Sequence, residues 1–222
     1  MQSPANFDSL VLDGLLVDWL SALKPYSVEA LVVLGPAVTG QARERWVHAV
    51  YPPRLQDTAQ ALADSPDFGY EWQASDSPMV AWQTISRGTY GELARWRLLA
   101  LGHGLQSMVR VEFSLPRSRA FECFLFTPQA MHERAEAAAL VWSTLNIWPK
   151  IKRAIADVTC PLSRREKECL ALAFDGQTAI ESAKSLQCSD RTVTYHIANA
   201  MRKLKVDNKI AAIERACWYG VI

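Results

Sequence analysis

The 222-residue sequence lacks the residue patterns that mark metal-binding proteins. Its five cysteines are odd in number and form no C-x-x-C pair, which is typical of reduced thiols rather than of a disulfide or zinc framework. Its four histidines are scattered without the spacing of metal ligands. We therefore expect no metal site and no resident cofactor.

Long apolar runs and enzyme motifs are also missing. No stretch approaches the ~18 uninterrupted apolar residues of a membrane span, and the first ten residues lack the basic and then apolar order of a signal peptide. The sequence contains neither G-x-S-x-G nor a phosphate-binding loop. These absences predict a cytoplasmic protein that does not bind membranes, is not an enzyme and has no catalytic residue.

A strong excess of one charge is absent as well, because the net charge is only +1. The charge is nevertheless uneven. From Pro161 onward there are ten Lys and Arg residues and seven Asp and Glu residues, whereas the preceding residues include fourteen Lys and Arg and sixteen Asp and Glu. Seven of the eight tryptophans lie before residue 150. Both the charge balance and the tryptophan content change between about residues 150 and 161, so we predict a first domain at 1–156, a linker at 157–161 and a second domain at 162–222.

Patterns of both helices and strands are present in the first 156 residues. Helical spacing or composition predicts helices at 7–23, 54–63, 91–102 and 128–156. Short apolar or β-branched runs predict strands at 28–35, 46–51, 106–114 and 120–127. The order indicates an α/β fold, an α-β-α sandwich around an antiparallel sheet. In the long helix, Ala135, Ala138, Trp142 and Leu145 recur at helical spacing on one apolar face, and Pro149 predicts a break or kink.

The C-terminal segment carries paired helix-start signals. Ser163 with Glu166 and Thr178 with Glu181 each match the S/T-x-x-E capping box, in which side chain and backbone at a helix start bond reciprocally. Residues 187–189 then form a short turn, and Ser189 is suited to cap a third helix. Two short capped helices joined by such a turn indicate a helix-turn-helix.

The third helix has two chemically different sides. Val193, Ile197, Ala200 and Leu204 form one apolar stripe at helical spacing. The opposite side is rich in groups that donate to phosphates and base edges, so we expect it to enter the major groove of double-stranded DNA. The candidate DNA-binding residues are Thr178, Ser189, Arg191, Thr192, Thr194, Tyr195, Asn199, Arg202 and Lys203.

About 60 C-terminal residues resemble the LuxR-type helix-turn-helix domain from end to end, an all-α four-helix fold. The quoted segments are LSRREKECLALAFDG, SDRTVTYHIANAMRKLKV and AAIERACWYGVI. Ser182 and Gln187 depart from the pattern, where the family has isoleucine and a turn glycine. The resemblance implies transcription regulation by a homodimer, with RNA polymerase a further candidate partner. The fourth helix would pair through Ile210, Ala211, Ile213, Glu214 and Cys217.

Within that family, the length and the TVTYH segment look most like the quorum-sensing branch, which binds N-acyl-homoserine lactones in its N-terminal domain. Tyr51-Pro52, Ser65-Pro66 and GHGLQSMVRVEF carry this looser resemblance. Ser65 stands where the branch has an aspartate, and Met108 where it has a glycine. Aromatic residues are suited to line an apolar pocket. The candidate signal-binding residues are Tyr51, Ser65, Tyr70, Trp72, Trp82 and Met108.

Two alternatives remain open from the sequence. The first is a LuxR-type regulator that needs no ligand, because the aspartate and the aromatic pair that hold the lactone are not matched. The second is an alternative sigma factor, whose last domain is a similar helix-turn-helix that binds RNA polymerase. The β-rich runs at 106–114 and 120–127 argue against the second alternative, because a sigma factor would have a helical N-terminal region.

Overall fold

The computed structural model describes residues 5–36, 45–65, 80–85, 94–116, 119–131 and 133–222. The chain divides into two compact units, Met1–Ile151 and Lys152–Ile222. Helix α5 (Arg134–Thr159) begins in the first unit and ends in the second. Residues 157–159 of the predicted linker are therefore helical, and the change between units falls a few residues earlier than composition indicated.

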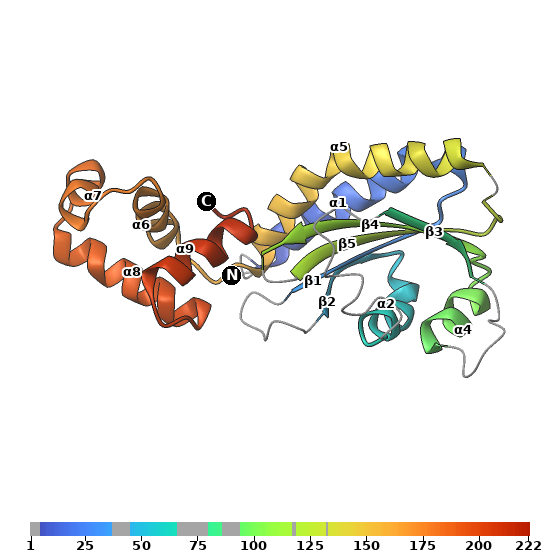
Figure 1. Cartoon of the computed structure of the whole chain (residues 1–222), viewed down its shortest axis with the longest axis horizontal. Coiled ribbons are helices and arrows are strands. Elements are labelled where there is room, and N and C mark those ends of the chain that lie inside the picture. The colour runs from blue at the N-terminus through green and yellow to red at the C-terminus, as the bar shows by residue number, and fades with distance from the viewer. Residues whose placement is uncertain (1–4, 37–44, 66–79, 86–93, 117–118, 132) are drawn as a thin grey trace. The chain divides into compact units, whose positions relative to one another are not determined.

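A five-stranded antiparallel sheet forms the centre of the first unit (Figure 1). Its spatial order is β2-β1-β5-β4-β3. The strands are β1 (Ala30–Pro36), β2 (Arg45–Tyr51), β3 (Val80–Thr84), β4 (Ser107–Leu115) and β5 (Arg119–Thr127). Four of them match the predicted strands. The edge strand β3 was not predicted, because five residues hold too little alternation to indicate a strand and only their pairing with β4 defines it.

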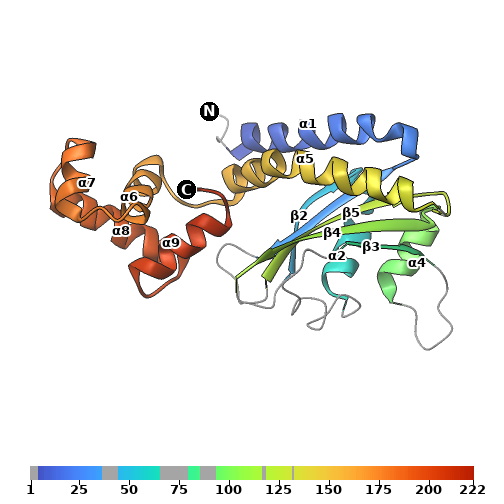
Figure 2. The same cartoon turned by 45° about the horizontal axis from the view of Figure 1, so that its top comes forward.

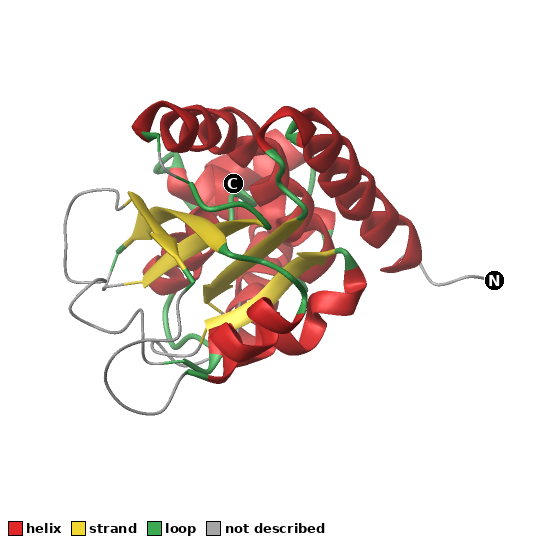
Figure 3. Cartoon of the chain, turned by 90° about the vertical axis from the view of Figure 1, so that its right-hand side faces the viewer, coloured by secondary structure: helices red, strands yellow, loops and turns green. Residues whose placement is uncertain are grey.

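Helices cover both faces of this sheet (Figures 2 and 3). Helix α1 (Ala5–Ala22) and helix α5 lie side by side on one face, and helices α2 (Gln56–Ala63) and α4 (Arg95–Gly102) lie on the other. Two short 3₁₀ turns, η1 (Lys24–Tyr26) and η2 (Pro53–Leu55), connect these elements. The α-β-α sandwich predicted from the sequence is confirmed.

The face under α2 and α4 holds an apolar core. Met108, Phe124 and Phe126 from the two central strands are fully buried there. They pack in one cluster with Leu62 of α2 and Trp96 of α4. Burial of such large apolar side chains is the main favourable contribution to folding.

The opposite face fixes the orientation of α5. Trp148 stacks on Phe113 with ring centroids 4.2 Å apart and lies 5.2 Å from Phe121. Trp19 of α1 donates from Nε1 to Ser143 Oγ at 3.0 Å. Helix α5 runs through Pro149 as one helix, so the predicted break does not occur. Its buried positions within the first unit are Ala137, Leu140, Thr144, Trp148 and Ile151.

The apolar face predicted from Ala135, Ala138, Trp142 and Leu145 is therefore not the face that packs on the sheet. All four of these residues are exposed, and Trp142 keeps 67% of its surface accessible. Helical spacing identifies apolar faces, but α5 has two of them, and only the contacts with the strands decide which one is buried.

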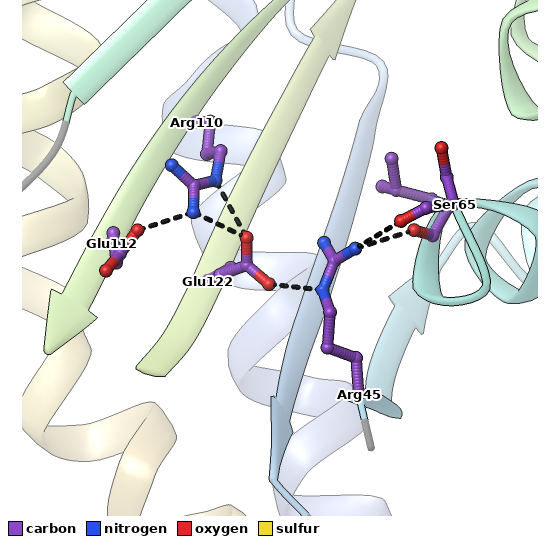
Figure 4. Close-up of polar contacts among 6 residues, drawn as sticks. Arg45, Ser65, Arg110, Glu112 and Glu122 are labelled. Atoms are coloured by element: carbon purple, nitrogen blue, oxygen red, sulfur yellow. Dashed lines mark hydrogen bonds and ion pairs between the residues drawn. The ribbon is translucent and has the colours of Figure 1, made fainter. Parts of the chain in front are cut away.

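Charged side chains are also buried on the face under α2 and α4 (Figure 4). Arg110 donates from Nε to Glu122 Oε1 at 2.8 Å and also pairs with Glu112. Arg45 donates from Nε to the second oxygen of Glu122 at 2.6 Å and from Nη1 to the carbonyls of Leu62 and Ser65. Burial raises the pKa of Glu112, and the positive charge of Arg110 opposes that rise. The carboxylate of Glu122 thus joins strands β2, β4 and β5.

The second unit is helical. Its helices after α5 are α6 (Arg164–Phe174), α7 (Ala179–Leu186), α8 (Asp190–Leu204) and α9 (Lys209–Trp218). Cys169, Ala183 and Val193, one from each of the first three, form the buried centre. The all-α four-helix arrangement predicted for this segment is confirmed.

We expect Glu122→Gln to lower the free energy of unfolding by about 3–5 kcal/mol, because it leaves buried guanidinium groups without their carboxylate. Urea unfolding of the full chain measures this change. Glu168→Gln is the matched control, because it removes a carboxylate from two ion pairs whose arginine side chains are 92% and 58% exposed. Equal unfolding midpoints for the two variants would contradict the importance of the buried cluster.

We expect Gln187→Gly to stabilise the turn before α8 locally. Gln187 has φ 54° and ψ 47°, a left-handed conformation that costs a residue with a Cβ roughly 1 kcal/mol and glycine much less. Hydrogen exchange of peptides from 176–206 measures the effect, with slower exchange as the expected result. Faster exchange would mean that the Gln187 side chain stabilises the turn by more than its left-handed backbone conformation costs.

Candidate nucleic-acid interface and signal site

Helix α8 presents a stripe of exposed residues opposite its buried one. Val193, Ala200 and Leu204 are at most 1% exposed, and Ile197 is half-buried. On the far side, Arg191, Tyr195, Ala198 and Arg202 are all exposed at steps of four, three and four residues. Because these steps follow the helical repeat, two cations and a phenol share one outward face. Ala198, which the sequence analysis did not single out, is the small residue between them.

The N-terminal turn of α8 is tightly held. Ser189 Oγ accepts from the backbone N–H of Thr192 at 3.1 Å, and the hydroxyls of these two residues lie 2.8 Å apart. Thr194 Oγ1 donates to the carbonyl of Asp190. Ser189 and Thr194 are exposed, whereas Thr192 is half-buried. The caps fix the direction in which this turn projects.

Lys203 occupies a different environment from the other predicted contacts. Its Nζ donates to Glu166 Oε2 at 2.8 Å, and its side chain is 34% exposed. Glu166 also accepts from the backbone N–H of Ser163 at 2.7 Å, which completes the predicted capping box of α6. Burial alone would raise the pKa of Glu166, but the hydrogen bonds from Lys203 and Ser163 outweigh it and lower that pKa. Lys203 therefore also joins α8 to the start of α6.

The remaining predicted DNA contacts are Thr178 and Asn199. Thr178 is exposed and caps α7, where Glu181 completes a second capping box. The hydrogen bond from the backbone N–H of Thr178 lowers the pKa of Glu181. Asn199 is half-buried and accepts from Arg202 at 3.1 Å. The roles of these residues in DNA binding remain predictions.

Helix α9 carries the residues predicted to pair two copies. Ile210 is 76% exposed, and Ala211, Ile213, Glu214 and Cys217 are half-buried. Ala212 and Ala216 point into the unit and are at most 1% exposed. Asn208 Oδ1 accepts from the N–H of Ala211 and caps the helix. One side of α9 closes the core, and the other side keeps the predicted pairing residues accessible.

The predicted signal contacts lie at several places in the first unit. Met108 is fully buried in the core under α2 and α4, and Tyr51 and Ser65 are half-buried. The backbone of Trp82 in β3 pairs with Val109 of β4. Tyr70 and Trp72 lie outside the described residues. The sequence predictions thus fall on both central and edge strands of the sheet.

A pocket of about 560 Å³ opens between β2 and α2. Polar groups from Arg45, Gln56, Gln60 and Asp64 line it together with Trp46, Val47 and Ala63. The lining residue Asp64 directly precedes the predicted signal contact Ser65 in the sequence. The backbone carbonyl of Ser65 accepts a hydrogen bond from Arg45 at 3.3 Å. Sequence reasoning missed Arg45, because its partners come from segments 17 to 77 residues away.

Two further properties concern only the described residues. Within them, no group of three or more His, Cys, Asp or Glu side chains is placed to hold a metal ion. Across the same ranges, no helix is both long enough and apolar enough to cross a membrane.

The sequence matches known regulators in two ways. Residues 160–216 match the family described as bacterial regulatory proteins, luxR family. The chain is 37% identical over 92 residues to the transcriptional activator protein LuxR of Aliivibrio fischeri, which covers 41% of this chain and 37% of that protein. It is 34% identical over 202 residues to the transcriptional activator protein SolR of Ralstonia nicotianae, covering 90% of this chain and 74% of SolR. The match to LuxR of Aliivibrio fischeri thus spans little more than a third of that protein's length.

The fold also has a solved counterpart. The crystal structure of SdiA from Escherichia coli aligns with a TM-score of 0.51 at 19% sequence identity, covering 100% of this chain and 93% of that one. This likeness concerns the fold, an α/β sandwich followed by a helical unit. With 34% identity to SolR over most of both sequences, the chain belongs to the LuxR family of bacterial regulatory proteins.

Proposed function

We propose that the chain is a homodimeric, sequence-specific DNA-binding regulator controlled by a small-molecule signal in its first unit. The observation that carries the DNA-binding part is the outward stripe of α8, with Arg191 and Arg202 on the same face as Tyr195. A helix of this width fits the major groove of B-form DNA. Arginine donates in a planar fork that matches guanine edges and phosphates.

The start of α8 supports the same orientation. Unpaired N–H groups and the helix dipole favour a phosphate at a helix N-terminus. Ser189 and Thr194 are exposed there and Thr178 is exposed at the start of α7, so their hydroxyls can contact the DNA backbone. The accessible side of α9 would pair two copies, so that the dimer reads two half-sites. The relatives are transcriptional activators, and the proposal assigns no catalytic residue.

We expect Arg191→Ala to weaken binding to duplexes selected by the wild-type chain by about 1–3 kcal/mol if Arg191 contacts a base edge. If it contacts a phosphate, the loss is similar for all sequences and the slope of log affinity against log salt falls by about one. Fluorescence anisotropy over a salt series distinguishes the two cases.

Lys24→Ala is the matched control for that measurement. Lys24 is exposed in the first unit, and its removal changes the net charge by the same amount. Equal effects of the two substitutions would mean that only overall charge matters, and unchanged affinity in Arg191→Ala would mean that the binding face is assigned wrongly.

The signal part of the proposal is supported by the pocket beside α2. Four of its seven lining residues are polar or charged and can orient a polar ligand, and its volume falls within the common range of small-molecule sites. An alternative sigma factor is not favoured, because the first unit contains a five-stranded sheet. A regulator that needs no ligand is the alternative that the ligand measurement decides.

We expect at least one N-acyl-homoserine lactone to raise the melting temperature of the full chain. A ligand that binds only the folded state at one hundred times its Kd stabilises that state by about 2.7 kcal/mol. Differential scanning calorimetry across a panel of acyl-chain lengths measures the shift, with the ring-opened acyl-homoserines as controls. If no lactone shifts the transition and DNA affinity is unaltered by every lactone, the signal-independent alternative holds.

A further inference from the structure

The outward face of α8 has an apolar centre between two charged ends. Thr194 and Ala198 are both exposed and lie four residues apart, so they are neighbours on the same side of the helix. Arg191 lies about one turn before them and Arg202 one turn after them. The two arginines are about 16.5 Å apart along the helix axis. We call Thr194 and Ala198 the methyl pair, because each carries one methyl group.

A hydrogen bond restricts where the methyl group of Thr194 lies. Thr194 Oγ1 donates to the carbonyl of Asp190, four residues earlier, at 2.9 Å. A threonine side chain has staggered positions, and this bond places the hydroxyl at the position beside the preceding turn of the helix. The γ-methyl group therefore occupies a different position, on a residue that is exposed. The centre of the face offers carbon where its ends offer guanidinium groups.

The methyl pair also has a rigid support. Val193 and Ala200, on the buried side of the same helix, are at most 1% exposed. Ser189 caps the first turn by accepting from the backbone N–H of Thr192 at 3.1 Å. Rotation of α8 about its axis would expose Val193 to water, which is unfavourable. The methyl pair therefore keeps one outward direction.

The edges of the base pairs carry only one kind of apolar group in the major groove. This group is the C5 methyl of thymine, and the other groups on these edges are hydrogen-bond donors and acceptors. Alanine and the methyl group of threonine are suited to contact the thymine methyl. A polar base edge placed against the methyl pair would lose bound water without gaining a hydrogen bond. The centre of the α8 face thus favours thymine over the other bases.

We propose that Thr194 and Ala198 select one thymine in each half-site of the operator by contact with its C5 methyl group. This inference rests on the proposed binding of DNA by α8 and adds the identity of one base to it. Selection at this position is apolar, whereas the arginines at the two ends supply hydrogen bonds to guanine or phosphate. Because 5-methylcytosine carries the same methyl group, it binds more tightly than cytosine at this position.

Deletion of single methyl groups from the DNA tests the contact from one side. Duplexes selected by the wild-type full chain are remade with each thymine in turn replaced by deoxyuridine, which lacks only the C5 methyl group. We expect the replacement to weaken binding about fourfold at one thymine of the half-site, the effect of one buried methyl group. Fluorescence anisotropy measures the ratio of the two affinities.

Deletion of single methyl groups from the protein tests the contact from the other side. Ala198→Gly removes one methyl group, and Thr194→Ser removes another while keeping the hydroxyl that bonds Asp190. We expect each variant to lower the ratio of affinities for thymine and deoxyuridine from about four to about two or less. The ratio is taken within each variant, so changes in folding or in overall DNA affinity cancel.

Thr159→Ser is the matched control. Thr159 Oγ1 donates to the carbonyl of Ile155 at 2.7 Å, the same four-residue bond that Thr194 makes, but at the end of α5. This variant loses the same methyl group from the same kind of site, and we expect its ratio to stay at about four.

Cytosine methylation completes the experiment. With the selected thymine changed to cytosine, we expect 5-methylcytosine to bind the wild type about fourfold more tightly than cytosine. Three results would each overturn the methyl contact: no thymine whose replacement by deoxyuridine weakens binding, an unchanged ratio in both Ala198→Gly and Thr194→Ser, or equal affinities for the two cytosines. In these cases the wild type still binds DNA, and the proposed function stands. A wild type that binds no duplex would overturn both proposals.

Discussion

The carboxylate of Glu166 joins the start of helix α6 to helix α8, which carries the proposed DNA-binding face. One of its oxygens accepts from the backbone at the start of α6 and from Lys203 near the end of α8. A helix in a small helical unit can rotate about its own axis unless something fixes it. The buried stripe at Val193, Ala200 and Leu204 restricts that rotation, and the Glu166–Lys203 bond anchors the far end. Together they hold the exposed arginines of α8 in one outward direction.

A buried cluster of charged side chains connects several elements of the first unit. Glu122 sits at the centre of a buried cluster in which Arg110 comes from the neighbouring strand and Arg45 from the far edge strand. Arg45 also bonds the carbonyls at the end of α2, so the cluster connects a helix to the middle of the sheet. Ion pairs of this kind contribute little net stability compared with apolar packing, but they penalise every alternative arrangement that separates the partners. We infer that they define the position of α2, and with it the walls of the pocket.

In helix α5, the periodicity of the sequence predicts an apolar face but not which apolar face is buried. The spacing of Ala135, Ala138, Trp142 and Leu145 correctly indicated an apolar helix face. The helix has a second apolar face that includes Leu140 and Trp148, and this one packs on the sheet because Phe113 and Phe121 lie there to receive Trp148. Neither face is distinguishable by spacing alone. The exposed face was visible in the sequence as a pattern, but its exposure was not.

The sequence by itself determined the C-terminal unit almost completely. Its signals are local: a capping box joins residues three apart, a turn occupies three residues, and the stripe of α8 repeats within one helix. Even the left-handed conformation of Gln187 follows from its place in the turn. The tertiary structure alone decided the pairing of β3, the buried face of α5 and the partners of Arg45. These depend on residues up to 124 positions apart meeting in space, and no pattern within a short window contains that information.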